Sequence, residues 1–364
     1  MSRSLSVLIG SLLIARYASA NYDINDNVSF SGFGSTSWAK SNNEMPLLIN
    51  RDISDSSCFD CDTTLGLQLD IYYEAFKASA QLVKRPQDDW SDPELEWAYV
   101  GYNNGPWTVQ LGRLRNPLFL YSEYYYVGQA YTPARPPGEV YNSILGITFY
   151  EGGSLTYTYD FAEEYSLAIT PFFGLEDNKK IQLNDVTLLD LDTHNMLGLN
   201  FTLSNDNSRW NLSYLKSKYD QKVTLINYTV STPIGPMTIP SFVQEEKNKK
   251  IELYSLGAEY ELNNVTLAAE AQKNDRTYSW YLMSAIQLNS FKPYLSYAQQ
   301  YNDDHKLDGD SVLLGTRYDL LYNVSLNAEW QYFHAEKDQN GSFIDTPNSK
   351  SHAQLFTIMI NFVF

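Results

Sequence analysis

The eleven residues QLFTIMINFVF, numbered 354–364, decide the fold of this chain. Apolar side chains recur there at every second position: Phe356, Ile358, Ile360, Phe362 and Phe364. A period of two is typical of a β-strand whose two faces meet different surroundings. The chain has a formal net charge of -17, yet this end is apolar, whereas the ends of soluble domains are mostly frayed and polar. We expect the apolar face of this stretch to be buried or to contact lipid.

The same alternation recurs along the whole chain. Clear examples are 65–73, 197–203, 254–262, 265–271 and 324–332. Stretches of this kind predict strands with one apolar and one polar face, each about 9–12 residues long, which is enough to cross a bilayer when tilted. No segment has a convincing helical period. The sequence therefore predicts an all-β fold.

Short and long breaks between these strands alternate. Short breaks carry Asn, Gly or acidic residues, as at 103–106, 205–207 and 263–264. The longer, polar stretches are 39–61, 86–91, 115–149, 175–192, 219–249, 302–309 and 337–350. One break that takes the place of a long stretch in this alternation, 274–276, is short. Glu151-Gly152-Gly153 is interpreted as a bend within one strand, which keeps the strand number even. The pattern predicts a transmembrane antiparallel β-barrel of about 16 strands, with tight turns at one end and longer loops at the other.

A closed barrel also explains the apolar end of the chain. The strand 354–364 must pair with the first strand, Val28–Trp38, because an unpaired strand edge in lipid is costly. A soluble β-sandwich or β-solenoid would show alternation too. Two features disfavour it: the strand length, and the aromatic residues near strand ends, such as Tyr73, Trp107 and Trp210, which suit lipid–water interfaces.

The first twenty residues have the features of a secretory signal. A basic residue, Arg3, precedes an apolar core from Leu5 to Ala15, and Ala18-Ser19-Ala20 matches a small-residue cleavage site. The apolar core is too short to span a bilayer. We expect residues 1–20 to be removed after Ala20, which leaves 21–364 as the barrel.

The polar strand faces are predicted to point into the barrel. Acidic residues outnumber basic ones among the candidate pore-wall side chains: Asp70, Lys77, Glu94, Glu96, Glu259, Glu270, Arg317 and Glu329. A barrel of this strand number is wide enough for water, and acidic walls favour cations. The alternative is that many of these acids lie near the rims and only keep the surface soluble.

The connection 115–149 is the longest in the chain and differs from the others. It is rich in tyrosine and carries Pro133, Pro136 and Pro137, so we expect it to fold inward, stiffen and set the pore size. The candidate constriction residues are Arg113, Arg115, Glu123, Tyr124, Tyr125, Tyr126, Arg135 and Glu139. Alternation places Arg113 on the lipid-facing register, which makes it the weakest of the three arginines as a pore residue.

This arrangement resembles the Gram-negative 16-stranded porins, in which the third external loop forms the constriction. The terminal Phe364 resembles the C-terminal signature of bacterial outer-membrane proteins, and "GRLR" at 112–115 before an aromatic loop is similar to a porin-like group of marine and related proteobacteria. The resemblance implies a homotrimer in the bacterial outer membrane, in contact with lipid and lipopolysaccharide. It implies passive diffusion of ions and small hydrophilic solutes. General porins carry an arginine ladder opposite the loop; this chain has none, so the basic side would come from the loop itself.

Other functions leave weaker signals. The channel could instead be selective for a sugar or oligosaccharide, with Tyr121, Tyr124, Tyr125, Tyr126 and Tyr131 stacking on its rings, or a plugged barrel could serve as an adhesin or receptor through its loops. No Ser–His pair of a barrel hydrolase is evident, so we expect no enzyme, no cofactor and no metal. The acidic composition disfavours nucleic acid as a partner. Cys58 and Cys61 form half of a zinc motif without partners, and a local disulfide is the favoured reading in an oxidising compartment.

Overall fold

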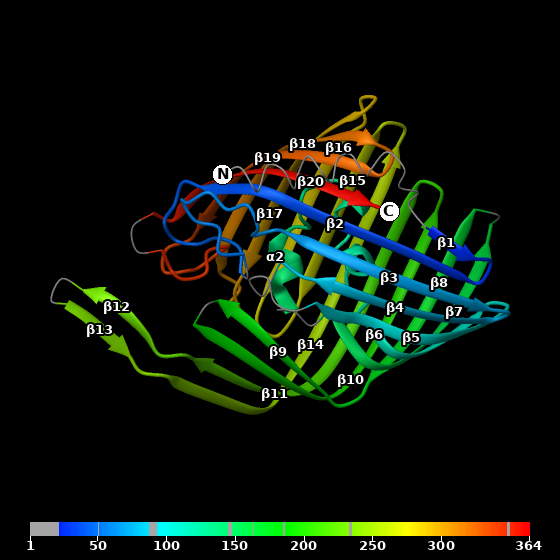
Figure 1. The fold of residues 1–364 in the computed structure, drawn as a ribbon, viewed down its shortest axis with the longest axis horizontal. Coiled ribbons are helices and arrows are strands. Elements are labelled where there is room, and N and C mark those ends of the chain that lie inside the picture. Colours follow the sequence, from blue (N-terminus) through cyan, green and yellow to red (C-terminus); the bar gives the residue numbers. More distant parts are fainter. Residues whose placement is uncertain are drawn as a thin grey trace.

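The computed structural model describes residues 22–49, 51–86, 93–144, 148–162, 164–184, 186–232, 235–347 and 350–364. They form a closed antiparallel barrel of 16 strands (Figure 1). The predicted signal peptide and its cleavage site after Ala20 lie outside the described residues. The barrel strands are β2 (Val28–Ser41), β3 (Thr64–Tyr73), β4 (Phe76–Lys84), β5 (Glu94–Asn104), β6 (Trp107–Arg115), β7 (Phe149–Phe161), β8 (Tyr165–Gly174), β10 (Thr187–Asn205), β11 (Ser208–Leu225), β14 (Phe242–Leu262), β15 (Val265–Lys273), β16 (Tyr278–Ile286), β17 (Phe291–Tyr301), β18 (Leu307–Leu321), β19 (Val324–Ala335) and β20 (His352–Val363).

The barrel closes between its first and last strands. The ladder between β2 and β20 runs from Phe33 opposite Val363 to Ser41 opposite Leu355. Gly32 and Phe364 exchange two backbone hydrogen bonds of 2.8 Å each. The ring of Phe364 lies where a Cβ on Gly32 would be, 2.3 Å from its nearest atom, so this position accepts only glycine without a shift of the ring. The predicted pairing of the terminal strand with the first strand is confirmed.

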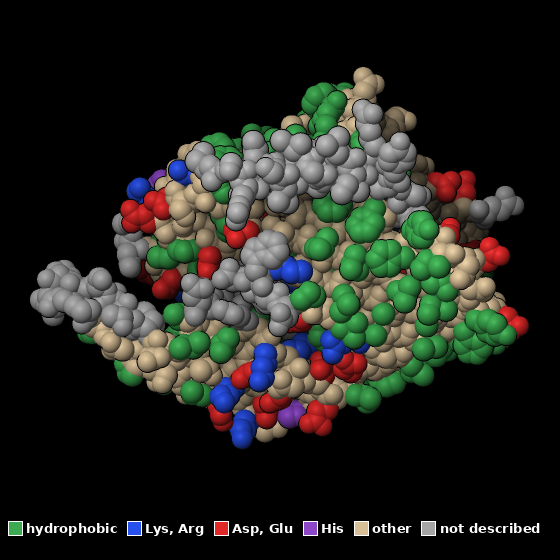
Figure 2. Space-filling view, viewed as in Figure 1, with side chains coloured by type: hydrophobic (Ala, Val, Ile, Leu, Met, Phe, Trp, Pro, Cys, Tyr) green, Lys and Arg blue, Asp and Glu red, His purple; other side chains and the backbone are tan. Residues whose placement is uncertain are grey.

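The outer surface of the barrel is apolar and the inner surface is polar. On β3, Leu65 and Ile71 are more than two-fifths exposed, whereas Asp70, which points the other way, is buried. Figure 2 shows apolar side chains gathered over the wall that contains β3 to β8, and exposed residues there include Leu82, Val100, Leu111 and Leu155. An apolar surface of this extent is unstable in water and suits lipid. The soluble β-sandwich and β-solenoid are therefore excluded for these residues.

The short connections are tight turns, as predicted. Gly105, Asn263 and Asn289 adopt positive φ values of 54–56°, the conformation that glycine and asparagine tolerate best. Glu74 and Ala162 adopt similar values of 52° and 53° although neither residue is favoured there. Glu151, Gly152 and Gly153 lie within the continuous strand β7, so the interpretation as part of one strand is confirmed.

Two of the predicted loops are largely strand. Within 175–192, β9 (Asp177–Asn184) continues the ladder beside β10, and within 219–249, β11 and β14 extend until the hairpin of β12 (Tyr228–Thr232) and β13 (Gly235–Ile239). Charged residues are frequent in these extensions, and their few apolar side chains, such as Ile181, Tyr219 and Val223, pack into one small cluster. Figure 1 shows the β12–β13 hairpin projecting from the barrel, and β1 (Tyr22–Asn25) pairs with the start of β2.

Within the part of the chain that the structure describes, the helical turns lie between β6 and β7. They are η2 (Ser122–Tyr124), η3 (Gly128–Ala130), α2 (Gly138–Tyr141) and η4 (Asn142–Ile144). Across the described ranges, no helix has the length and apolar character needed to cross a membrane.

Candidate functional site

The segment between β6 and β7, which we call the L3 segment (116–144 and 148), is hydrogen-bonded to carboxylates of the polar strand faces. The amide of Leu120 donates to Glu270 of β15 at 2.7 Å. The amide of Ala134 donates to Glu329 of β19, also at 2.7 Å. These bonds join residues 150 and 195 positions apart in the chain, so the L3 segment is held against the wall that contains β14 to β19.

Tyrosine hydroxyls strengthen this attachment. Tyr121 donates to Glu259 of β14 at 2.8 Å, and Tyr141 donates to Glu270 at 2.9 Å. Tyr281 of β16 donates to the same oxygen of Glu270 at 3.3 Å. Three of the predicted wall acids, Glu259, Glu270 and Glu329, therefore bind the L3 segment, and hydrogen bonds to carboxylates are among the strong ones in proteins.

A basic side chain of the wall holds the same segment. Arg317 of β18 donates to the carbonyl oxygens of Gln129 at 3.2 Å and Tyr131 at 2.8 Å, and it pairs with Asp319 at 2.8 Å. Two other predicted wall residues, Asp70 of β3 and Lys77 of β4, form an ion pair of 3.1 Å between neighbouring strands.

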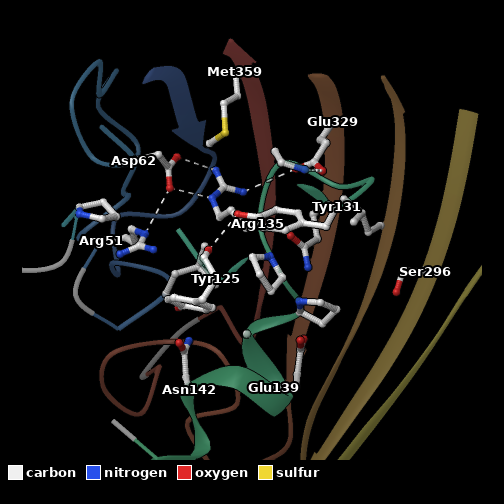
Figure 3. Close-up of a pocket in the computed structure, with 18 of the residues that line it drawn as sticks. Arg51, Asp62, Tyr125, Tyr131, Arg135, Glu139, Asn142, Ser296, Glu329 and Met359 are labelled. Atoms are coloured by element: carbon white, nitrogen blue, oxygen red, sulfur yellow. Dashed lines mark hydrogen bonds and ion pairs between the residues drawn. The ribbon is translucent and has the colours of Figure 1, made fainter. Parts of the chain in front are cut away.

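Arg135 lies at the centre of a buried ion network (Figure 3). It makes two hydrogen bonds to Asp62, of 2.8 and 2.9 Å, and lies 3.6 Å from Glu329. Arg51 approaches the same Asp62 at 3.2 Å. Burial disfavours the charged form of Asp62, but Arg135 and Arg51 outweigh this effect and hold its pKa at about 2. The carboxylate therefore stays ionised and ties the connection between β2 and β3 to the L3 segment.

Arg115 and Glu96 meet through an irregularity in the sheet. The register between β4 and β5 shifts at Gln81 and Leu82, which leaves Glu96 as the extra residue of a β-bulge. Glu96 is buried and binds Arg115 at 2.7 Å, and Arg85 lies between Glu96 at 3.7 Å and Glu94 at 2.7 Å. The strand pattern alone could not place these side chains together, because a bulge reverses the alternation.

The other predicted constriction residues lie in different surroundings. Arg113 binds Glu151 at 2.5 Å and the carbonyl of Leu95 at 2.7 Å, both on neighbouring strands. Glu123 and Tyr124 are exposed. Glu139 is buried and accepts a hydrogen bond of 2.5 Å from Ser311 of β18.

The tyrosines of the L3 segment pack mainly on one another. Tyr121, Tyr126 and Tyr131 are buried, and the ring of Tyr141 is stacked against Tyr121 and Tyr125, with centroids 6.1 and 5.8 Å apart. Burial raises the pKa of Tyr131 well above its usual range, so its hydroxyl stays neutral. Few of these tyrosine rings have a free face on which a sugar ring could stack, as the alternative of a sugar-selective channel requires.

Two functional residues escaped the sequence analysis as partners of Arg135. Asp62 directly follows the predicted loop 39–61 and Arg51 lies within that loop, where no local pattern marks either residue. A disulfide joins Cys58 and Cys61, as the sequence favoured, and it ends directly before Asp62. The hydroxyl of Ser37 on β2 also donates to Asp62, at 2.8 Å. In the sequence, the only sign that the backbone of Asp62 is held in place is that Asp62 directly follows the CxxC motif.

No protein-family model and no curated protein matches this sequence. Solved structures match its fold over nearly the whole chain. An anion-selective porin from Comamonas acidovorans has 12% identity and a TM-score of 0.60, with 93% of this chain and 99% of that chain covered. OmpF of Salmonella typhi in complex with daunomycin has 15% identity and a TM-score of 0.58, with 94% and 100% covered.

An outer-membrane protein of Vibrio cholerae is also similar. In-vitro folded OmpT of that organism, in its trimer form, has 12% identity and a TM-score of 0.56, with 93% of this chain and 99% of that chain covered. Identities this low speak for the fold alone. With its closed barrel of 16 strands, the chain has the fold of the Gram-negative outer-membrane porins.

Proposed function

We propose that this chain is an outer-membrane porin that lets ions and small hydrophilic solutes diffuse passively, with a preference for cations. The observation that carries the proposal is the barrel itself: an apolar outer wall, a polar inner wall, and a long segment hydrogen-bonded across the inner side. A barrel of this strand number has room for water between its walls.

The L3 segment is the proposed constriction. Its attachment through Glu259, Glu270, Glu329 and Arg317 keeps it against one side of the lumen. A segment held there would take up part of the cross-section between the walls. We therefore propose a narrow channel, suited to small solutes.

The balance of charge supports the preference for cations. Basic side chains of the inner wall and of the L3 segment lie beside carboxylates, as in the pairs Lys77–Asp70, Arg115–Glu96, Arg135–Asp62 and Arg317–Asp319. By contrast, Glu139, Glu259 and Glu270 form no ion pair within the described ranges, although Arg209 lies opposite Glu259 in the ladder. Glu259 is the one of these three acids that is not buried, and an uncompensated acid that faces an aqueous passage raises the local concentration of cations.

Location and assembly follow from the same proposal. The chain would be exported by the signal at 1–20, cleaved after Ala20, inserted among outer-membrane lipid and lipopolysaccharide, and assembled as a homotrimer. The trimer form of the Vibrio cholerae OmpT neighbour supports the last point. N-terminal sequencing of the mature protein and the mobility of unheated protein in detergent gels test the cleavage site and the trimer.

The decisive experiment is single-channel recording in a planar bilayer with a potassium chloride gradient. The proposal predicts stepped, ohmic current whose reversal potential has the sign for cation flow. Stepped current with an anion-selective reversal potential would support the porin function but contradict the proposed preference for cations. A protein that inserts as a folded barrel and carries no current would refute the porin.

A further inference from the structure

The cavity beside the L3 segment is lined by charged groups of both signs. It lies between the L3 segment, the connection from β2 to β3, and the strands β17 to β20, and Figure 3 shows it with side chains that line it. Its charged lining consists of Arg51, Asp62, Arg135, Glu139 and Glu329. Two of these groups have few partners among the described residues: Arg51 has N–H donors without a hydrogen bond, and Glu139 has no ion pair.

Arg51 is the cation with spare donors. Its side chain is 12% exposed, and its closest described partner is Asp62, at 3.2 Å. Asp62 makes two shorter contacts with Arg135. Among the described residues, Nε of Arg51, which makes the 3.2 Å contact, and Nη1 form no hydrogen bond. A guanidinium offers five N–H donors, so a buried one with unfilled donors favours an anionic partner.

Glu139 is the anion without a cation. It is 4% exposed, and Ser311 donates to one of its oxygens at 2.5 Å. Within the described ranges Glu139 forms no ion pair, and burial raises the pKa of its carboxyl. A buried carboxylate of this kind is costly unless a positive group neutralises it. In the view of Figure 3, Arg51 lies to the left of Tyr125, and Glu139 lies below and to the right of it.

We propose that this cavity binds a small zwitterion of the amino-acid class, with its carboxylate on Arg51 and its ammonium group on Glu139. The proposal rests on the porin function, because the solute reaches the cavity through the channel. A neutral solute satisfies neither group, a simple cation satisfies only Glu139, and a simple anion satisfies only Arg51. The cavity of about 60 Å³ holds roughly four to six water-sized positions, which is close to the size of glycine.

The test uses the full mature protein in planar bilayers with symmetrical potassium chloride. Glycine, β-alanine and γ-aminobutyrate, which differ in the spacing of their charges, are added in turn, with acetamide as a neutral compound of matched size. The proposal predicts that at least one zwitterion lowers the single-channel conductance in the millimolar range, where acetamide leaves it unchanged. Arg51→Gln and Glu139→Gln should each raise the half-blocking concentration about tenfold or more, because each removes one charged partner.

Two exposed residues of another loop provide matched controls. Lys306→Gln and Asp304→Asn remove one charge of each sign from side chains that are 72% and 68% exposed, and neither should change the block. Equal effects of the zwitterions and acetamide, or a block that survives both cavity variants, would overturn the proposal.

Calorimetry on the protein in detergent keeps the two proposals separate. Zwitterion binding that is lost in Arg51→Gln supports the site even if no current is seen, which would reject only the porin. Normal potassium chloride current without any zwitterion binding would reject only the site.

Discussion

Asp62 connects three parts of the molecule, and its replacement by asparagine is the sharpest test of how the L3 segment is held. The carboxylate accepts hydrogen bonds from Arg135 and Ser37 and lies 3.2 Å from Arg51. Asparagine has nearly the same shape but no charge, so Asp62→Asn leaves two buried guanidiniums with weaker partners. We expect a less stable protein with more open-channel current noise, because the region around Arg135 gains freedom.

The size of the effect follows from the pKa of Asp62. The pKa is about 2 in the folded protein against an ordinary value of 3.8, and the side chain is almost fully buried. Each pH unit of such a difference corresponds to about 1.4 kcal/mol, so the ionised carboxylate stabilises the fold by about 2–3 kcal/mol. The folded-state pKa is the lower one. The stabilisation is therefore complete above about pH 4 and is lost as the pH falls toward 2.

Urea unfolding of the detergent-refolded barrel, followed by tryptophan fluorescence, measures this loss. At pH 7 the free energy of unfolding of Asp62→Asn should be lower by about 2–3 kcal/mol. The difference from the wild type should shrink as the pH approaches 2, where Asp62 itself becomes protonated. Asp55→Asn, an exposed acid in the same loop, is the matched control and should stay within about 0.5 kcal/mol of the wild type.

Two results would refute the reasoning. One is an equal, small loss of stability for the Asp62 and Asp55 variants at pH 7. The other is a difference between Asp62→Asn and the wild type that does not change between pH 5 and pH 2. Either would mean that Arg135 does not depend on the charge of Asp62.

Three further predictions concern the anchors and the packing of the barrel. Glu270→Ala removes the acceptor of the Leu120 amide and should destabilise the barrel by about 2–5 kcal/mol and raise the single-channel conductance; unchanged conductance would show that the L3 segment is held without it. Gly66→Ala places a methyl group 2.1 Å from the buried ring of Phe33 and should cost about 1–3 kcal/mol in urea unfolding, whereas Gly101→Ala, with its nearest neighbour at 3.6 Å, should cost less; equal costs would contradict this packing. Replacing both Cys58 and Cys61 by serine should increase current noise as Asp62→Asn does, and reducing agent on the wild type should reproduce it; quiet channels in both tests would mean that the disulfide does not fix Asp62.

The architecture was predictable because lipid and water impose opposite demands on alternate residues. In β3 and β20 the apolar and polar positions differ strongly, so the period of two survives in the sequence. The same logic failed for β9 and for the extended parts of β11 and β14. Those extensions are rich in charged residues and have few apolar side chains, such as Ile181 and Tyr219, so their composition is similar to that of a loop.

The lumen was less predictable than the wall. Glu270 and Arg135 were predicted as pore residues from residue type and position. Apart from Tyr281, which is 11 residues from Glu270, their partners are 129–150 and 73–222 residues away in the chain. The pairing of Glu96 with Arg115 depends on a β-bulge. The long contact of Arg51 with Asp62 depends on the shorter bonds that Arg135 makes to the same carboxylate. Such pairings are decided by packing in three dimensions, which no local pattern records.

The β12–β13 hairpin has a practical use that follows from its separation from the barrel. Its two strands pair only with each other in a sheet of their own, through five register pairs from Tyr228–Ile239 to Thr232–Gly235. A peptide inserted between these strands would lengthen the hairpin and leave every ladder of the barrel intact. The hairpin is therefore a suitable place for an epitope or a fluorophore, and if it lies on the cell surface, as the predicted loop 219–249 does, the protein could be counted and tracked on living cells through it.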